Sequence, residues 1–303
     1  MGEVKSEDLG IVLVHEHIAA FPRDYDLHPN PEFDEEGALN RVAEEFLALK
    51  AYGVNTIMDA TPPGFGRNMK YAIQLAEESG LNIILSTGLF LESAMPADTM
   101  DKETDELAYA MENELVAGIG QTNVKAGIIK VAVSNNNIAA FEVKALRAAA
   151  RAHRATGTPI ITHTEPGQSM GREQMDIFED EGVAPSKIVI GHSCCCPDLE
   201  YHLDLLHRGV SVGFDRIGLE RPDYVGDDVR LAAIAGLIAA GYGKQLLLSQ
   251  DVVGIHPFPA DFSLPQRSYL YLFKDFIPRL RRAGVRQETI NAILVENPRR
   301  LFS

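Results

Sequence analysis

The chain has 303 residues, of which 46% are hydrophobic and 23% charged, and its formal net charge is -15. This negative charge argues against nucleic acid or an anionic membrane as a partner bound through a general basic surface. The sequence has no uncharged apolar stretch of membrane-spanning length and no apolar core of a secretory signal near its start, so we expect no membrane partner.

Apolar runs alternate with amphipathic segments along the chain, as in repeated βα units. Strands are predicted near 11–15, 54–60, 83–88, 127–133, 159–164, 187–192, 209–214 and 246–250. Helices are predicted near 35–51, 68–79, 104–118, 138–156, 170–181, 198–207, 228–240 and 266–283, and a ninth near 287–295 is expected to stop at Asn297-Pro298. Eight parallel strands close a barrel, so we predict an α/β fold, a (β/α)8 TIM barrel, as a single domain over residues 1–303.

An open, doubly wound sheet would give a similar alternation. Polar residues at several non-adjacent strand ends favour the closed barrel over a single switch point. No G-x-G-x-x-G opens a helix, and neither a Walker loop nor a G-x-S-x-G elbow occurs in the sequence. The commonest nucleotide-binding and serine-hydrolase classes are therefore not indicated.

His15 and His17 stand at the end of the first apolar run. Residues two apart on a strand point to the same face, so both imidazoles are predicted to face the barrel interior. Such a pair can chelate a divalent metal. A polar strand end with solvent-facing histidines is the alternative.

Lys130 lies within the apolar run Ile128–Val133. A buried ammonium is costly unless it is paired or neutralised. A neutral lysine can react with carbon dioxide to give a carbamate, which is a carboxylate able to bridge two metals. A lysine paired with a barrel carboxylate is the alternative interpretation.

His163, His192 and Asp251 each follow a further apolar run. Strand-final residues of a parallel barrel gather at one mouth, where imidazoles and carboxylates together can hold a metal. A histidine of this kind alone is more often a core or capping residue, and Asp251 alone could cap the next turn. The combination of these three with His15, His17 and Lys130 is far more specific than any pair.

Several other polar residues have simpler interpretations. The consecutive Cys194, Cys195 and Cys196 cannot form a loop-closing disulfide framework, which indicates a reducing, cytoplasmic setting. Thiolate ligation or a vicinal disulfide is one interpretation of this run, and packing of small residues at the barrel rim is the other. Glu165 could line the mouth or lie at the surface.

The strand-end motifs resemble the phosphotriesterase family of the amidohydrolase superfamily, and in character its phosphotriesterase-like lactonases. The similar segments are Leu-Val-His-Glu-His-Ile near the start, Ala-Gly-Ile-Ile-Lys-Val-Ala at 126–132, Thr-His-Thr at 162–164, Gly-His-Ser at 191–193, Ser-Gln-Asp at 249–251 and Glu-Asn-Pro-Arg-Arg-Leu-Phe at 296–302. The resemblance covers nearly the whole chain, and it implies a (β/α)8 barrel with two divalent metal ions, commonly zinc, and a homodimer.

The resemblance also implies roles for the six residues. His15, His17 and Asp251 would bind one metal ion. His163 and His192 would bind the other, and Lys130, carboxylated by carbon dioxide, would bridge the two ions together with a hydroxide. Asp251 would also be catalytic, because it would take the proton of that hydroxide.

Three positions concern the substrate. Where phosphotriesterases have an aspartate in a proton relay, this chain has Cys195, which argues against efficient organophosphate hydrolysis. Arg216 is similar to an arginine of the lactonase-like members, and its guanidinium could hold a carbonyl or a leaving alkoxide. Phe90 stands where those lactonases often have a tyrosine, and it can pack against a substrate without donating a hydrogen bond.

We therefore expect a metal-dependent hydrolase that opens a lactone or a carboxylic ester of a small molecule, with phosphotriesters as a side activity. An N-acyl amide hydrolase of the same fold is one alternative. A catalytically silent barrel that keeps its metal and binds a small molecule or partner is the other. The loops near 215–228 and 252–266 are expected to set specificity.

Overall fold

The computed structural model describes residues 2–21, 25, 27–134, 137–165, 169–221, 224–257 and 267–303. Within these ranges nine strands form one sheet in the order β8-β7-β6-β5-β4-β3-β2-β1-β9, and every neighbouring pair is parallel. The strands are β1 (Ile11–Ala19), β2 (Val54–Asp59), β3 (Asn82–Gly88), β4 (Ile128–Val133), β5 (Ile160–Thr164), β6 (Ile188–Ile190), β7 (Ser211–Phe214), β8 (Leu246–Leu248) and β9 (Val253–Ile255). The predicted parallel α/β architecture is confirmed.

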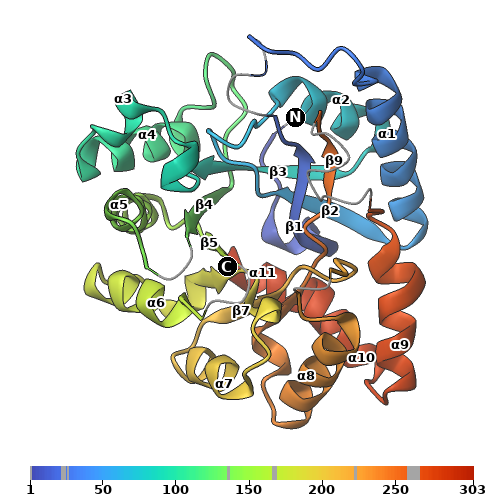
Figure 1. The fold of residues 1–303 in the computed structure, drawn as a ribbon. Helices are drawn as coiled ribbons and strands as arrows, with labels where there is room; N and C mark the ends of the chain where they lie inside the picture. Colours follow the sequence, from blue (N-terminus) through green and yellow to red (C-terminus); the bar gives the residue numbers. More distant parts are fainter. Residues whose placement is uncertain are drawn as a thin grey trace.

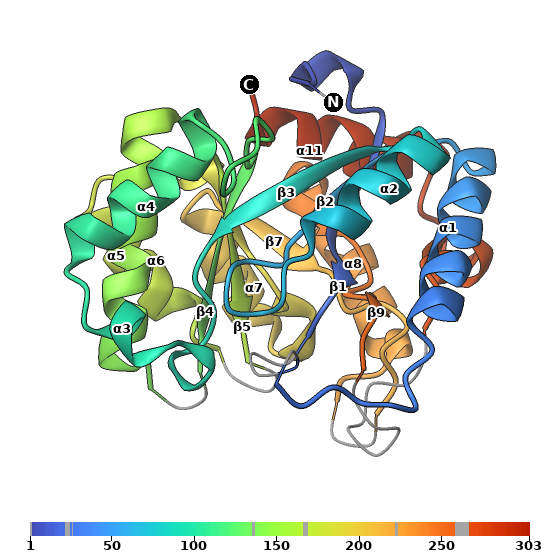
Figure 2. The ribbon, with the colours of Figure 1, turned by 90° about the horizontal axis from the view of Figure 1, so that it is seen from above.

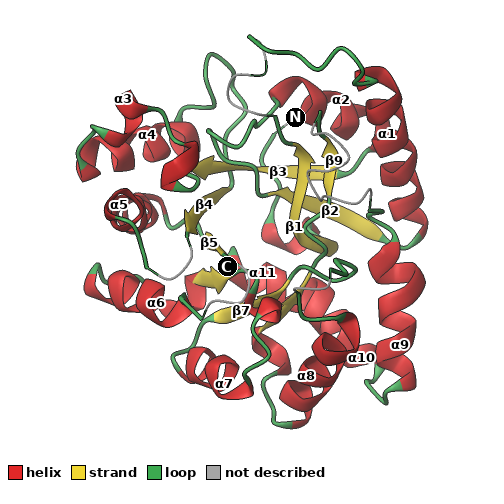
Figure 3. Ribbon diagram, in the orientation of Figure 1, coloured by secondary structure: helices red, strands yellow, loops and turns green. Residues whose placement is uncertain are grey.

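The sheet is curved, and the main helices lie around its outside (Figure 1, Figure 3). They are α1 (Glu35–Ala51), α2 (Met69–Ser79), α3 (Ala97–Met100), α4 (Thr104–Val116), α5 (Ala140–Thr156), α6 (Gly171–Asp180), α7 (Leu199–His207), α8 (Asp227–Ala239), α9 (Ile277–Arg282), α10 (Gln287–Asn291) and α11 (Asn297–Leu301). The predicted start of the helix near 266–283 touches residues outside the described ranges. Among the described helices, none is long and apolar enough to cross a membrane.

Local sequence signals explain several helix ends. The Asp34 carboxylate accepts the Gly37 N–H at the start of α1, and Asn68 does the same for Tyr71 in α2. Helix α5 ends at Gly157, which takes the left-handed conformation that glycine tolerates.

The two faces of the sheet bury different apolar clusters. The concave face packs Leu9, which precedes β1, and Leu301 of α11 against side chains of several strands. The strand residues are Val12, Val14, Met58, Ile128, Ile161, Val189 and Leu247. The convex face packs against the helices in a much larger cluster. Helix α11 and both termini lie at one end of the strands in the side view (Figure 2), so the concave core fills that end and leaves the carboxyl ends of the strands for polar residues.

The seam between β8 and β1 contains an element that the sequence analysis did not predict. Strand β9 follows β8 after four residues and pairs with β1, with His17 opposite Val253. The His17 N–H donates to the Val252 carbonyl at 2.9 Å, and the Asp251 N–H donates to the His15 carbonyl at 3.0 Å. The segment 249–255 thus runs along β1 on the side opposite β2.

The prediction that Asn297-Pro298 ends the last helix is wrong. A π-helical turn, Ala292–Glu296, leads directly into α11, whose first turn contains Pro298. The π-helical turn precedes the proline directly, and in it the Asn297 N–H donates to the Ala292 carbonyl five residues back. A π-helical turn of this kind is one of the ways in which a helix departs from the regular α-helical ladder. The Asn297 side chain instead donates to the carbonyls of Gly243 and Leu246 at 2.8 and 2.7 Å, which ties the helix to the start of β8.

Candidate active site

A β-bulge in β1 places both of its histidines inside the sheet. Val12 and Val14 belong to the concave cluster and Leu13 to the convex one, and the pairing register with β2 then shifts between Leu13 and Glu16. A bulge reverses the alternation of faces beyond it. His15 and His17 therefore point to the concave side.

Asp251 meets these two histidines from the far side of the seam. Its Oδ1 lies 3.1 Å from His17 Nε2 and 3.8 Å from His15 Nε2. Asp251 adopts a φ of 54°, which is rare for a residue with a side chain. Burial alone raises the pKa of its carboxyl, but His192 and Arg216 outweigh this and hold the pKa well below the usual range. The carboxylate is therefore ionised at neutral pH.

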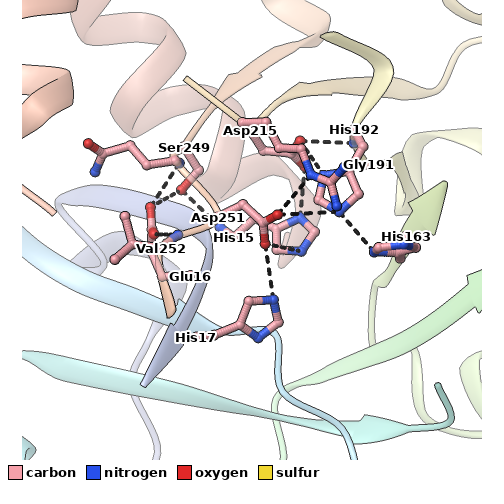
Figure 4. Close-up of polar contacts among 12 residues, drawn as sticks. His15, Glu16, His17, His163, Gly191, His192, Asp215, Ser249, Asp251 and Val252 are labelled. Atoms are coloured by element: carbon pink, nitrogen blue, oxygen red, sulfur yellow. Dashed lines mark hydrogen bonds and ion pairs between the residues drawn. The ribbon is translucent and has the colours of Figure 1, made fainter. Parts of the chain in front are cut away.

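His163 and His192 form a second group. His163 lies in β5 on the same face as Ile161, whereas His192 reaches inward because its φ is 55°. His192 Nε2 lies 3.0 Å from His163 Nδ1. His15 and His192 stack with ring centroids 4.6 Å apart, so the two groups are adjacent (Figure 4).

In each of the four imidazoles, the ring nitrogen that points away from the other site histidines forms a hydrogen bond with an oxygen atom. His15 Nδ1 and His192 Nδ1 donate to the two oxygens of Asp215, at 2.7 and 2.9 Å. His163 Nε2 donates to Glu165 at 3.1 Å. The outer nitrogen of the remaining histidine, His17, donates to a hydroxyl.

That hydroxyl belongs to Thr61 and lies 2.8 Å from His17 Nδ1. Its own hydrogen goes to Asp59, so its oxygen is left to accept from the imidazole. The four outer contacts fix the tautomers and leave a lone pair on each inward nitrogen. Metal-bound histidines show this arrangement, with the non-ligating N–H held by a carboxylate or another oxygen.

Lys130 lies at the centre of these groups. Its side chain is fully buried, and its Nζ is 2.5 Å from His15 Nε2. Burial lowers the pKa of Lys130 to about 7, while Asp251 and Asp215 act in the opposite direction. Burial followed by the charge of Lys130 also lowers the pKa of His15 to about 4. A large fraction of Lys130 is therefore neutral near pH 7.

The residues predicted to meet the substrate surround this centre. Arg216 follows β7, its Nε donates to Asp251 Oδ2 at 2.8 Å, and its Nη1 lies 3.9 Å from Cys195 Sγ. Cys195 and its two neighbours are buried free thiols. Phe90 follows β3 and meets the His163 ring edge-on at 5.4 Å.

The donor set fits divalent cations. Two groups with close-lying donor atoms occur among the described residues, one of His15, His17 and Asp251 and one of His15, His192 and Asp215. In the second group, the Nδ1 atoms of His15 and His192 already donate hydrogen bonds to Asp215. At the second pair of histidines, two inward lone pairs face each other at 3.0 Å with no hydrogen left to place between them, and a cation would remove that repulsion.

Four residues described at this site were not predicted, namely Asp59, Thr61, Phe65 and Asp215. Asp59 ends β2 and Asp215 directly follows β7, and the rule that selected the other polar residues at strand ends would have found both. Phe65 stacks on Phe90 at 4.4 Å and meets His17 edge-on at 5.1 Å. It lies in the loop after β2, and no periodicity or spacing marks it.

Three further histidines form hydrogen bonds elsewhere in the described structure. His153 and His202 bond the carbonyls of Thr158 and Ser193, and His207 bonds a tyrosine hydroxyl. The imidazoles, lysine and carboxylates at the ends of parallel strands define a metal-dependent hydrolase.

Comparison with known proteins assigns the family. The model of the phosphotriesterase family matches residues 1–302. An aryldialkylphosphatase of Saccharolobus solfataricus is 31% identical, with 99% of this chain and 97% of that protein covered. A phospho-furanose lactonase of Mycoplasmopsis agalactiae is 32% identical, with 100% and 90% covered. A variant of the phosphotriesterase-like lactonase of Deinococcus radiodurans is similar in structure, with a TM-score of 0.93, 36% identity, and 100% and 98% covered. The chain belongs to the phosphotriesterase family, and the prediction of a hydrolase is confirmed.

Proposed function

We propose that this hydrolase opens a lactone or a carboxylic ester at a site for two divalent cations, with zinc as the metal. The observation that supports it most is the orientation of the four imidazoles. Each has its outer nitrogen held by an oxygen and its lone pair directed inward, towards a buried lysine and a carboxylate. A structural cluster of histidines has no need of this shared orientation.

In this proposal His15, His17 and Asp251 hold one cation and His163 and His192 hold the other. Lys130 would link the two as a carbamate, formed when its neutral amine attacks carbon dioxide and loses a proton. Its burial and lowered pKa favour the neutral amine that this reaction requires. When bound, such a pair of ions supplies a hydroxide nucleophile at neutral pH and polarises the carbonyl.

The remaining roles belong to side chains of the chain itself. Asp251 Oδ1 faces the histidines and would accept a proton, while Oδ2 is held by Arg216. The other N–H groups of the Arg216 fork would hold the carbonyl or the leaving oxygen of the substrate. Phe90 would pack against its apolar part, and Cys195 would border the guanidinium.

Lactones and esters are favoured over phosphotriesters as the natural substrates. A lactonase is among the similar solved structures, at 36% identity. The relay position holds Cys195, whose Sγ lies 3.9 Å from Arg216 Nη1. Among the described residues, Asp251 is hydrogen-bonded to Arg216 and not to Cys195. Phosphotriester hydrolysis is proposed as a side activity.

The finer features of the architecture are also proposals. We infer that residues 1–303 form one domain, a closed (β/α)8 barrel in which β8 and β9 act as one interrupted strand beside β1. The hydrogen bonds from residues 251 and 17 across this seam support the closure. A cytoplasmic homodimer completes the proposal.

A substrate panel tests the proposed activity. Purified protein would be loaded with zinc and assayed on γ- and δ-lactones, aryl esters, a phosphotriester and N-acyl amino acids. We expect the lactones or esters to be turned over fastest, chelation to abolish turnover, added metal to restore it, and His163→Asn to abolish it. Preference for N-acyl amino acids would favour an amide hydrolase, and inactivity of the metal-loaded protein on the whole panel would favour a silent binding barrel.

A further inference from the structure

Glu16 is a buried carboxylate that the proposed reaction does not use. It stands between His15 and His17, and the strand directs it away from them, into the seam between β1 and residues 249–252 (Figure 4). Its Oε1 accepts the Ser249 hydroxyl at 2.8 Å and the Gln250 N–H at 2.9 Å. Its Oε2 accepts the Val252 N–H at 2.8 Å. Both oxygens of Glu16 are thus committed to one short segment.

Asp251 is the residue at the centre of that segment. The N–H groups on either side of it go to Glu16, and its own N–H goes to the His15 carbonyl. Its φ of 54° lies in the left-handed region, which residues with a Cβ seldom adopt. Such a conformation persists only where the surroundings over-determine it.

Arg267 holds the same segment from the other side. Its two terminal nitrogens donate to the carbonyls of Gln250 and Asp251. Glu16 therefore binds N–H groups and Arg267 binds carbonyl groups of one turn. Burial raises the pKa of Glu16 to about 8, while its hydrogen-bond donors and Arg267 act in the opposite direction. Ser249 links this arrangement to the strand, because its hydroxyl accepts the His15 N–H at 3.0 Å.

We propose that Glu16 and Arg267 are positioning residues, which together hold Asp251 so that Oδ1 faces the Nε2 atoms of His15 and His17. This inference rests on the proposed function, because it takes Asp251 as a metal ligand. The role requires an acceptor oxygen at both Oε positions, since an amide of the same shape accepts hydrogen bonds on one atom only. It also requires a guanidinium, since lysine has no planar fork to reach two adjacent carbonyls.

Cobalt binding separates this role from a general contribution to folding. Co²⁺ alone would be titrated into the metal-free wild type, Glu16→Gln and Arg267→Gln, with visible absorption as the readout. We expect the affinity for the first ion to fall about tenfold or more in both variants, as when the supporting partner of a metal ligand is removed. Glu77→Gln and Arg282→Gln, which change exposed residues of the same types, should bind as the wild type does.

A second readout excludes mere loss of stability. Circular dichroism of the metal-free proteins identifies variants that fold, and only these are compared. If Glu16→Gln does not fold, Arg267→Lys, which keeps the charge and loses the fork, takes its place with the same expected result. Folded variants with wild-type cobalt affinity overturn the inference.

The test also distinguishes this inference from the proposed function. If the wild type binds Co²⁺ but turns over no lactone or ester, the proposed substrate class fails, and the titrations still decide the roles of Glu16 and Arg267. With an active wild type, lactone kinetics should show kcat falling at nearly constant KM in the two variants. If the wild type binds no Co²⁺ at all, the ligand set fails and this inference fails with it.

Discussion

Lys130 Nζ lies 2.5 Å from His15 Nε2, and both side chains are fully buried. Two protonated groups at this distance would repel each other strongly in a region without solvent. Burial and this proximity together lower the pKa of His15 to about 4, and burial lowers that of Lys130 to about 7. The pair therefore favours two neutral nitrogen bases, one able to bind a metal and one able to bind carbon dioxide.

The first prediction concerns the pH dependence of stability. The pKa of Lys130 is about 7 in the folded protein and near its ordinary 10.5 in the unfolded chain. Between these values the unfolded chain binds the additional proton, so Lys130 costs stability at pH 7, and the cost shrinks by about 1.4 kcal/mol per pH unit as the pH rises. In metal-free, carbon-dioxide-free buffer, Lys130→Met should be more stable than the wild type at pH 7, with the difference declining towards pH 10.

Urea unfolding of both proteins across this pH range measures the effect. Because all other titrating groups are shared, their contributions cancel in the difference. A difference that stays constant from pH 7 to pH 10 would show that Lys130 has an ordinary pKa in the folded protein.

Carbon dioxide should control metal uptake. If a carbamate on Lys130 links two ions, the metal-free wild type should take up two equivalents of zinc in bicarbonate and markedly less without it. Lys130→Met should be indifferent to bicarbonate. Elemental analysis after gel filtration gives the ratio of zinc to protein, and equal uptake by the wild type in both buffers would argue against the carbamate.

Asp215 should act on both groups of ligands at once. It accepts from His15 Nδ1 and His192 Nδ1, which belong to different proposed metal sites. The side-chain amide in Asp215→Asn has one acceptor oxygen in place of two, so it cannot accept the hydrogen bonds of both imidazoles in the present geometry. Zinc affinity should therefore fall roughly 10- to 100-fold. A competition titration with a chromogenic chelator measures this, and Asp98→Asn, at an exposed position, is the control. If Asp215→Asn binds zinc as tightly as the wild type, Asp215 does not support the metal site.

The inward direction of the ligands was predictable only in part. Two-residue spacing placed His15 and His17 on one face, but the bulge that makes this the concave face appears only in the pairing of β1 with β2. His192 and Asp251 reach inward through left-handed backbone conformations. Such conformations in residues other than glycine leave no mark in a sequence, because their neighbours impose them.

Residues that support the ligands were harder to predict than the ligands. Asp215 directly precedes Arg216, and only the arginine was selected as a candidate site residue. Glu16 lay between two predicted ligands, and its role depends on β9, a three-residue strand that follows the last predicted strand closely. Contacts between segments more than 200 positions apart cannot be read from periodicity.

Arg216 should affect the chemistry more than metal binding. Arg216→Lys keeps the positive charge but loses the fork that binds Asp251 and, in the proposal, the substrate. A hydrogen bond to a charged group is worth about 1.5–3 kcal/mol, so kcat/KM for the best lactone should fall roughly 10- to 150-fold. Zinc content should not change, and Arg282→Lys should be as active as the wild type. A large loss of zinc in Arg216→Lys would instead place the arginine among the supports of the metal site.

A crystal structure of the zinc-loaded protein grown in bicarbonate, with anomalous maps at the zinc edge, tests the central claim most directly. We predict two anomalous peaks, one among His15, His17 and Asp251 and one between His163 and His192, with density for a carboxyl group beyond Lys130 Nζ reaching both. An unmodified amine at Lys130 and no anomalous peak among the imidazoles would contradict the account.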